Sequence, residues 1–261
     1  MKTDEASAKA ATPGGGPDTG FDDLAAEWEE YRSRPNPALK FFLPQVTGDD
    51  AVLEAGCANG RNLPPLAAKA RVVIGFDLSS AMLKHASERI AGLDNATALK
   101  ASVTAIPMPD GHFDKAFCLA VLHHLSTPES RAKAFAELYR VLKPGGLLFV
   151  TVWNRHQKKF EGLAGQDALV SWLTKKGGAV KRYYHFFEED EFRQDAEKAG
   201  FRVNELFFDR HVGKGKHDLT MHAKGAKNLC GVLEKPMPEA PEKPPGPRQL
   251  FPKARKHKHK K

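Results

Sequence analysis

The 261-residue sequence has only three cysteines, Cys57, Cys118 and Cys230, whose number and spacing fit neither a disulfide framework nor a CxxC metal site. No apolar run approaches the roughly 20 residues of a membrane span. The N-terminus lacks the basic segment and following apolar segment of a secretory signal. The composition also excludes a collagen, a coiled coil and a wholly disordered chain. We therefore expect a cytoplasmic protein with reduced thiols, no structural metal and no membrane span.

Positive charge is concentrated in two segments of the chain, whose net charge is +8. Residues 235–261 contribute +7, from nine Lys or Arg and two Glu, and residues 155–187 contribute +5, from seven Lys or Arg and two acids. The remainder is mildly acidic. This uneven distribution favours a polyanionic partner held at defined places. For residues 235–261 taken alone, a purely solubilising role is an equally good interpretation.

Composition divides the chain into three parts. Residues 1–20 are small, polar and rich in Gly and Pro, and residues 235–261 are dense in Pro and Lys, so we expect both to be disordered. Residues 21–234 carry the apolar pattern of one folded domain. Within that domain, residues 155–187 are expected to form a basic insert on the substrate side.

Short apolar strands alternate with helical patterns along the predicted domain. The predicted strands are 51–56, 72–77, 96–102, 113–120, 147–153, 202–209 and 228–235. The predicted helices are two pieces within 21–43, then 63–70, 79–92, 128–142 and 188–201. This alternation indicates an α/β fold with a doubly wound, mostly parallel seven-stranded sheet covered on both faces. Because a loop joins the last two strands, we expect one antiparallel edge strand.

Three features lie at the carboxyl ends of predicted strands, where a doubly wound sheet binds a nucleotide. A turn from Glu54 to Gly60 follows the first strand, and Asp77 ends the second. The third feature is the fourth strand, which residues 113–114 open and which ends at residues 119–121. Glycine lets the turn approach a ligand closely, and a carboxylate at position 77 can accept hydrogen bonds from ribose hydroxyls. An NAD site is the main alternative, but it normally requires G-x-G-x-x-G, which Ala58 interrupts.

Glu54, the position of Asp77 and the Leu-Lys-Pro-Gly-Gly before the fifth strand together resemble class I S-adenosylmethionine-dependent methyltransferases over about residues 45–153. The resemblance implies a Rossmann-like fold and S-adenosyl-L-methionine as cofactor. It implies these cofactor-binding residues: Glu54, Gly56, Cys57, Asn59, Gly60, Asp77, Leu78, Ser102, Val103 and Leu119. Many relatives bind adenine through an Asp after the third strand. Here that contact would come from the Ser102 hydroxyl and the Val103 N–H.

Four further segments resemble the tRNA wobble-uridine carboxymethyl methyltransferases. They are residues 31–37 (YRSRPNP), 121–126 (VLHHLS), 152–153 (VW) and 181–186 (KRYYHF). In that family the first resembles T-R-x-K-P-W-P, the second V-H-H-W-S and the last R-Y-Y-H, which this chain matches completely. The chain departs from the family at Asn36 and Leu125, where the family has Trp, and at Ala58, where it has Gly.

The resemblance implies methylation of a carboxymethyl group on the wobble uridine of tRNA. A carboxylate acceptor is already ionised at neutral pH, so it requires a cationic clamp rather than a general base. The expected catalytic residues are His124, Arg32, Arg182 and His185. Those expected to bind the acceptor are Arg34, His123, Trp153, Tyr183 and Tyr184, three of which have rings on which an unstacked base could lie. Those expected to follow phosphates are Lys158, Lys159, Lys175, Lys176 and Lys181.

Several alternatives stay open from the sequence. The tyrosines, together with Phe186 and Phe187, also fit a packed core, and Trp153 fits packing under the sheet edge. A methyltransferase for a small apolar or aromatic metabolite would use one of the paired histidines as a base. A non-catalytic RNA-binding protein on the same fold is a third interpretation.

Partner and location follow from the resemblance alone. The family works with a small zinc-binding activator protein that adds a strand to the sheet edge, and the resemblance implies the same partner here. It also implies the family's cytoplasmic location. The terminal KARKHKHKK segment equally fits a nuclear-localisation patch.

Overall fold

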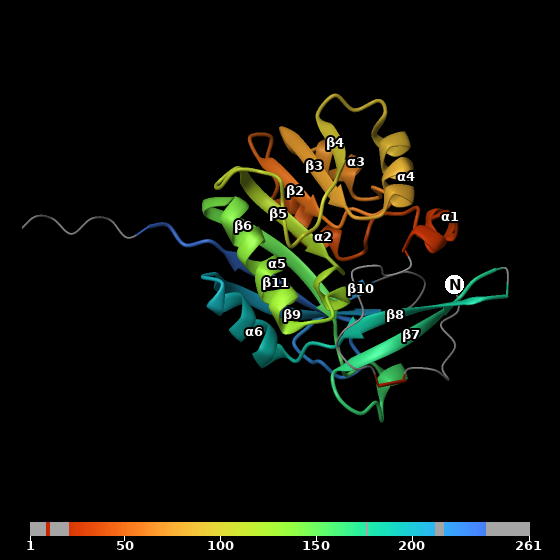
Figure 1. The fold of residues 1–261 in the computed structure, drawn as a ribbon. Helices are drawn as coiled ribbons and strands as arrows, with labels where there is room; N and C mark the ends of the chain where they lie inside the picture. Colours follow the sequence, from red (N-terminus) through yellow and green to blue (C-terminus); the bar gives the residue numbers. More distant parts are fainter. Residues whose placement is uncertain (1–8, 11–20, 176, 212–216, 239–261) are drawn as a thin grey trace, which may run out of the picture.

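The computed structural model describes residues 9–10, 21–175, 177–211 and 217–238, and its main feature is an eight-stranded sheet (Figure 1). The strand order is β10-β9-β11-β6-β5-β2-β3-β4. Its strands are β2 (Ala51–Ala55), β3 (Val72–Asp77), β4 (Ala96–Lys100), β5 (Phe113–Leu119), β6 (Leu142–Trp153), β9 (Arg202–His211), β10 (His217–Thr220) and β11 (Asn228–Glu234). Strands β4, β3, β2, β5 and β6 are mutually parallel, whereas β11 is antiparallel to both β6 and β9.

Helices cover both faces of this sheet because successive strand residues point to opposite sides. The helices are α1 (Phe21–Tyr31), α2 (Leu39–Phe42), α3 (Leu63–Ala67), α4 (Ser80–Ile90), α5 (Pro128–Val141) and α6 (Glu189–Lys198), with 3-10 turns η1 (Leu43–Gln45), η2 (Leu122–His124) and η3 (Lys158–Phe160). In β2, Val52 packs with the apolar residues of α2, α3 and α4, whereas Leu53 packs with those of α5 and α6. The sheet therefore separates two apolar cores.

A second, smaller sheet stands beside the carboxyl ends of the main strands (Figure 1). It consists of β7 (Asp167–Leu173) and β8 (Ala179–His185), which form an antiparallel hairpin, and of β1 (Lys9–Ala10), which pairs with β7. Its inner face packs on the end of β6 through a third apolar cluster, which includes Trp153, Trp172 and Tyr184. The predicted basic insert is therefore largely an ordered hairpin.

The predicted α/β class and doubly wound sheet are confirmed, with two differences in detail. The described sheet has eight strands rather than seven, because the short β10 pairs with β9. The expected antiparallel edge strand is β10, and a second antiparallel strand, β11, lies inside the sheet between β6 and β9. Most of residues 1–20 and 235–261 lie outside the described residues, so their expected disorder stays a prediction.

The described part of the chain has neither a helix that could span a membrane nor a group of metal ligands. No helix in it combines the length and the apolar character needed to cross a bilayer. Within the same residues, no three His, Cys, Asp or Glu side chains are grouped so as to hold a metal ion.

The turn after β2 depends on residues with positive φ angles. Gly56 has φ +77°, Gly60 has φ +70° and Ala58 has φ +47°, a region that costs a non-glycine residue about 1–2 kcal/mol. The same turn packs tightly: a Cβ atom at position 60 would lie 2.9 Å from the Cα and Cβ atoms of Ala86 in α4. At position 56 a Cβ atom would lie 2.3 Å from Cγ2 of Val121. Positions 56 and 60 therefore require glycine for two reasons: the positive φ angle, and the lack of space for a Cβ atom.

We predict opposite stability effects for two substitutions in this turn. Gly60→Ala should lower the free energy of unfolding by about 2 kcal/mol or more, because it adds both left-handed strain and overlap with α4. Ala58→Gly should raise it by about 0.5 kcal/mol, since relief of strain outweighs the added flexibility of the unfolded chain. Urea unfolding followed by circular dichroism measures both. A Gly60→Ala protein as stable as wild type would contradict the packing described above.

Candidate functional site

The predicted site residues gather at the carboxyl ends of β2, β3, β5 and β6, which we call the carboxyl edge. Glu54, near the end of β2, is buried; its Oε1 accepts a hydrogen bond from Nδ2 of Asn62 at 2.5 Å, whereas its Oε2 has no partner among the described residues. Burial is the main reason why the pKa of Glu54 rises to about 7. Asn62 in turn accepts the backbone N–H of Asn36 at 2.7 Å, which ties the 31–37 segment to this carboxyl group.

Asp77 ends β3 with its carboxylate held in a fixed orientation. Its Oδ2 accepts the backbone N–H of Ala58 at 2.8 Å, and its Oδ1 accepts that of Ser79 at 2.9 Å. Burial raises the pKa of Asp77, and these two hydrogen bonds oppose the rise. Each oxygen retains acceptor capacity, and the residue is partly exposed. The geometry therefore fits the predicted role of accepting ribose hydroxyls.

The other predicted cofactor residues are less uniform in orientation. The side chains of Cys57 and Leu119 are buried in the core shared with α2, α3 and α4, so only their backbone atoms can contact a ligand. Asn59 is fully buried, and its Nδ2 donates to Oε2 of Glu29 in α1 at 2.6 Å. Its Oδ1 has no partner within the described chain.

The adenine end of the predicted site lies after β4. Ser102 Oγ shares a 2.8 Å hydrogen bond with Thr104 Oγ1 and also accepts the Thr104 N–H. Val103 is buried and Leu78 is about half exposed. These residues follow β4 and β3, beside Asp77 in the order of the sheet.

Helix α1 lies across the carboxyl edge between α4 and the tip of the β7–β8 hairpin (Figure 1). Glu29 of α1 pairs with Arg89 of α4, and Glu30 pairs with Lys175 at the hairpin tip. At the start of the helix, the ring of Phe21 meets that of His124 edge-on, with centroids 5.2 Å apart. Helix α1 therefore covers the predicted acceptor side of the site.

The paired histidines of η2 are held as opposite neutral tautomers. The N–H of Trp153 donates to Nδ1 of His123 at 3.1 Å, so the His123 proton is on Nε2. Nδ1 of His124 lies 3.2 Å from the carbonyl oxygen of Tyr183, which can only accept, so His124 Nε2 is left as an acceptor. Burial, helped by the charge of Arg182, lowers the pKa of His124 to about 3. His124 is therefore a weak base at neutral pH.

The guanidinium of Arg182 is buried among aromatic rings. It lies 4.6 Å from the ring centroid of Phe21, 5.4 Å from that of Trp28 and 4.5 Å from that of Trp172. Its Nη2 donates to the Tyr184 hydroxyl at 2.5 Å, while Nε and Nη1 have no hydrogen-bond partner in the described structure. No described carboxylate pairs with it. Two donor atoms of a buried cation are thus left for a ligand.

Other side chains of the protein cover the faces of two rings, Trp153 and Tyr184, that were predicted to stack on an acceptor base. Trp153 and Tyr184 stack on each other with centroids 4.2 Å apart, and the other neighbour of Tyr184 is the ring of His123 at 5.3 Å. Both are almost fully buried, as are Phe186 and Phe187. The predicted stacking role of Trp153 and Tyr184 is corrected here: their faces are used to dock the hairpin on β6, as the packed-core alternative had it.

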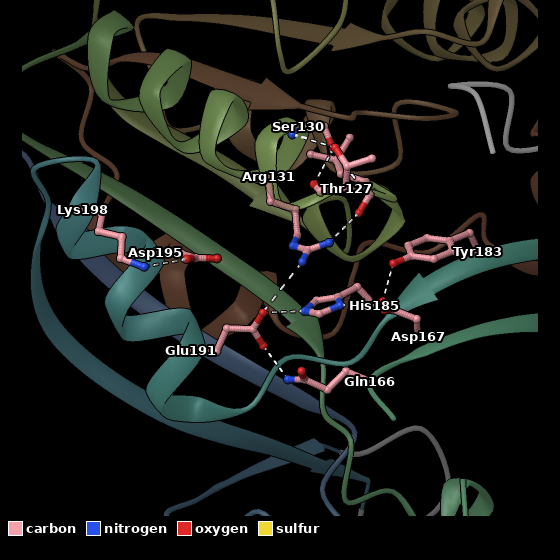
Figure 2. Close-up of polar contacts among 11 residues, drawn as sticks. Thr127, Ser130, Arg131, Gln166, Asp167, Tyr183, His185, Glu191, Asp195 and Lys198 are labelled. Atoms are coloured by element: carbon pink, nitrogen blue, oxygen red, sulfur yellow. Dashed lines mark hydrogen bonds and ion pairs between the residues drawn. The ribbon is translucent and has the colours of Figure 1, made fainter. Parts of the chain in front are cut away.

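His185 also differs from its predicted role as a clamp for the acceptor. Figure 2 shows it between two carboxylates: Nδ1 lies 2.8 Å from Oδ1 of Asp167, and Nε2 lies 2.8 Å from Oε1 of Glu191. Asp167 also accepts the Tyr183 hydroxyl, and Glu191 lies 3.9 Å from Arg131 of α5. Both ring nitrogens are therefore taken, and the network joins the hairpin to α5 and α6. We assign Tyr183 and His185 to positioning the hairpin.

The predicted phosphate-contacting lysines and Arg34 lie mostly on the surface. Lys158, Lys181 and Arg34 are exposed, and Lys175 pairs with α1. Lys176 lies outside the described residues, and the side chain of Lys159 is not among those described.

Two partly buried cations were missed by the sequence analysis. Arg61 directly follows Gly60 in the β2 turn, and Lys227 directly precedes β11. Burial lowers the pKa of both, and the charge of Arg32 lowers it further, to about 10 for Arg61 and to about 8 for Lys227. Nothing in their local sequence distinguished them from ordinary surface cations.

We predict that the His185 network stabilises the hairpin. His185→Ala should lower the free energy of unfolding by about 2 kcal/mol, because Asp167 and Glu191 would face each other without the ring between them. His156→Ala is the matched control, since His156 pairs with Glu188 at the surface and should change stability by less than about 0.5 kcal/mol. Urea unfolding with tryptophan fluorescence measures both. Equal effects of the two substitutions would refute a positioning role.

The chain is similar in sequence to known methyltransferases. Residues 53–150 match the family model described as a methyltransferase domain. A protein of Encephalitozoon cuniculi whose name describes a methyltransferase is 33% identical over 191 residues, which cover 70% of this chain and 85% of the relative. A tRNA (carboxymethyluridine(34)-5-O)-methyltransferase of Schizosaccharomyces pombe is 28% identical over 215 residues, which cover 73% of this chain and 90% of the relative. An Arabidopsis thaliana protein of the same name is 34% identical over 140 residues, 53% of this chain and 32% of the relative.

Solved structures share the fold at lower identity. The CcbJ methyltransferase of Streptomyces caelestis superposes with a TM-score of 0.66 at 18% identity, covering 84% of this chain and 98% of that one. A methyltransferase in complex with the Haloferax volcanii Trm112 methyltransferase activator gives a TM-score of 0.61 at 18% identity, and the match covers 85% of this chain and 100% of that one.

The carboxyl edge fits the cofactor of these enzymes. Glu54 Oε2 and Asn59 Oδ1 are buried acceptors without partners in the described residues, and the Asp77 carboxylate is oriented and partly exposed. Polar groups in this arrangement suit an amino-acid moiety next to β2 and a ribose next to β3. The chain belongs to the class I S-adenosylmethionine-dependent methyltransferases, and S-adenosylmethionine is its cofactor.

Proposed function

We propose that this methyltransferase acts on the carboxymethyl group of a wobble uridine in tRNA. The observation that carries the proposal is the pair of arginines beside Trp28. Arg32 lies 5.6 Å and Arg182 5.4 Å from the centroid of this one ring, and neither pairs with a described carboxylate. Guanidinium groups without a counter-ion next to the cofactor side of the site suit an anionic acceptor.

The state of His124 also supports an acceptor that is already ionised. When bound, S-adenosylmethionine supplies an electrophilic methyl group on a positively charged sulfur. A hydroxyl or amine acceptor would need a base to remove its proton, and the low pKa of His124 makes it a poor one at neutral pH. A carboxylate needs only to be oriented and desolvated, which the guanidinium groups of Arg32 and Arg182 would do. This favours a carboxylate over the small-metabolite alternative.

A tRNA substrate is supported by the named relatives and by surface charge. Two of the relatives described above are named as tRNA carboxymethyluridine methyltransferases. The hairpin segment 155–187 has a net charge of +5, and Lys158 and Lys181 are exposed on it. Exposed lysines next to a covered acceptor site would hold the phosphates on either side of one nucleotide. We further propose a cytoplasmic location, as for the family.

A zinc-binding activator protein is part of the proposal. Strand β4 is the outermost strand at one end of the described sheet, and its exposed residues include Leu99, which is 40% exposed. An unpaired strand edge with an exposed leucine suits the addition of a strand from a partner. The Haloferax volcanii neighbour with the same fold was solved in complex with the Trm112 methyltransferase activator.

The function is tested by incubating the chain, alone and with a co-expressed activator, with labelled S-adenosylmethionine and tRNA that carries carboxymethyluridine. We expect label in the wobble nucleoside, identified by mass spectrometry of the digested tRNA. Arg182→Met should lower transfer about 100-fold or more, because it removes the buried charge without emptying the space. Label found only in small molecules, with none in tRNA, would contradict the proposal and favour the metabolite alternative.

We predict a selective loss of cofactor affinity for a substitution at the end of β3. Asp77→Asn should weaken S-adenosylmethionine binding about tenfold or more, because the amide retains only one acceptor oxygen for the ribose side. Asp94→Asn is the control, since Asp94 is exposed in the loop before β4. Isothermal titration calorimetry gives both affinities. If the two variants bound the cofactor equally well, Asp77 would have no part in cofactor binding.

A further inference from the structure

Helix α1 is held against α4 at both of its ends. Near its start, Asp22 accepts hydrogen bonds from the Ser79 hydroxyl and, at 3.2 Å, from the Ala81 N–H. Two helical turns later, on the same side of α1, Glu29 pairs with Arg89 of α4. The helix that covers the acceptor side is therefore fixed to the helix that follows β3, on the cofactor side (Figure 1).

Asn59 and Arg89 hold the end of α1 around Arg32. Nδ2 of Asn59 donates to Oε2 of Glu29 at 2.6 Å and to the carbonyl oxygen of Arg32 at 3.2 Å. Arg89 donates from Nη1 to the Ser33 carbonyl at 3.3 Å and from Nε to the Asn59 carbonyl at 3.1 Å. These direct hydrogen bonds join the end of α1, the turn after β2 and α4. Together they fix the backbone from which the Arg32 side chain extends.

The carboxylate of Glu29 strengthens this hold because it stays ionised. Burial would raise the pKa of Glu29, but the hydrogen bonds from Asn59 and Arg89 outweigh burial and keep the pKa below its ordinary value. Hydrogen bonds to a charged acceptor are stronger than those to a neutral one. From the end of α1 held in this way, the Arg32 guanidinium reaches the ring of Trp28, 5.6 Å from its centroid.

Asn59 has a second polar atom that is available to the cofactor. The side chain is fully buried, and its Oδ1 has no hydrogen-bond partner among the described residues. It belongs to the turn after β2, whose polar groups suit the amino-acid moiety of S-adenosylmethionine. The ammonium group of that moiety is a donor, which an amide oxygen can accept. A hydrogen bond accepted at Oδ1 polarises the amide, and this strengthens donation from Nδ2 to Glu29 and Arg32.

We propose that Asn59 and Arg89 are positioning residues for Arg32, and that their hold on it is strengthened when Asn59 Oδ1 accepts the ammonium group of the cofactor. The inference rests on the proposed function, in which Arg32 orients the acceptor carboxylate. Cofactor and acceptor then bind with positive coupling, each raising the affinity for the other by the same factor. A ligand that keeps the adenosine but lacks the amino-acid moiety should not produce this coupling.

The test uses an anticodon stem-loop RNA with 5-carboxymethyluridine at the wobble position. Its affinity for the full chain is measured by fluorescence anisotropy with saturating S-adenosylhomocysteine or with saturating 5′-methylthioadenosine, which lacks the amino-acid moiety. We expect the wild type to bind the RNA about tenfold more tightly with S-adenosylhomocysteine. Arg89→Met should reduce this ratio to about threefold or less, with S-adenosylhomocysteine affinity changed by less than about twofold. Lys84→Met, at an exposed position of the same helix, is the matched control and should retain the ratio.

Hydrogen exchange gives a second readout, which needs no RNA. S-adenosylhomocysteine should slow amide exchange in residues 28–33 about fivefold more than 5′-methylthioadenosine does, because only the former can act on Asn59 Oδ1. Asn59→Ala should abolish this difference, and thermal unfolding verifies that the variant is folded. A second connection between α1 and the cofactor side runs from Asp22 through Ser79 to Asp77. The ribose of 5′-methylthioadenosine would act through that connection equally well.

The outcomes separate the inference from the proposed function. Equal RNA affinity of the wild type with the two ligands, with transfer to tRNA intact, would refute the inference alone. Equal slowing of exchange by both ligands would also refute it, since the connection would then run through Asp22 and Ser79. The same loss of coupling in Arg89→Met and Lys84→Met would reduce the effect to one of charge. Absence of RNA binding with either ligand would contradict the proposed function and, with it, the role of Arg32.

Discussion

The arrangement of the site depends on the burial of one positive charge, that of Arg182, which has no carboxylate partner among the described residues. A guanidinium removed from water is costly unless hydrogen bonds or ring faces replace its hydration. Arg182 is surrounded by Phe21 and Trp28 of α1, by Trp172 of β7 and by its own strand neighbour Tyr184. These rings come from α1 and from both strands of the hairpin. The buried charge of Arg182 is therefore a centre on which α1 and the hairpin pack together.

Helix α1 shows how the positive charges around the site are divided between two uses. It carries five acidic residues and no basic one; Glu29 pairs with Arg89 of α4, and Glu30 pairs with Lys175 at the hairpin tip. Glu29 also accepts a hydrogen bond from the buried Asn59, and Glu27 has a buried oxygen without a hydrogen-bond partner in the described structure. Among the described residues, no carboxylate forms an ion pair with Arg32 or Arg182. The acids of α1 are thus paired with cations on its flanks, whereas these two arginines are not.

The cofactor side of the fold could be predicted from the sequence, because its turns and caps depend on neighbouring residues. The acceptor side, formed by α1 and the hairpin, depends on contacts between residues far apart in the chain. Ser79 Oγ caps α4 by accepting the Met82 N–H at 3.0 Å, and such a cap involves only neighbouring residues. The sequence predicts the hairpin only as a basic insert, although the alternating apolar residues of β7 indicate a strand. The carboxylate partners of His185 come from β7 and α6, and only the folded chain brings these two elements to either side of its ring.

The two histidines illustrate why the same motif can serve different acceptors. A His-His pair after the fourth predicted strand is compatible with base catalysis as well as with orientation, and sequence does not separate the two. Here the Trp153 N–H fixes His123 as an acceptor at Nδ1, and the Tyr183 carbonyl fixes His124 as a donor at Nδ1. Both contacts come from backbone atoms, so neither depends on the protonation of a neighbour. Burial lowers the pKa of both rings, and the charge of Arg182 lowers it further. Under the proposed function, this arrangement suits an acceptor that arrives already charged, a property that the carboxymethyl group has and a hydroxyl lacks.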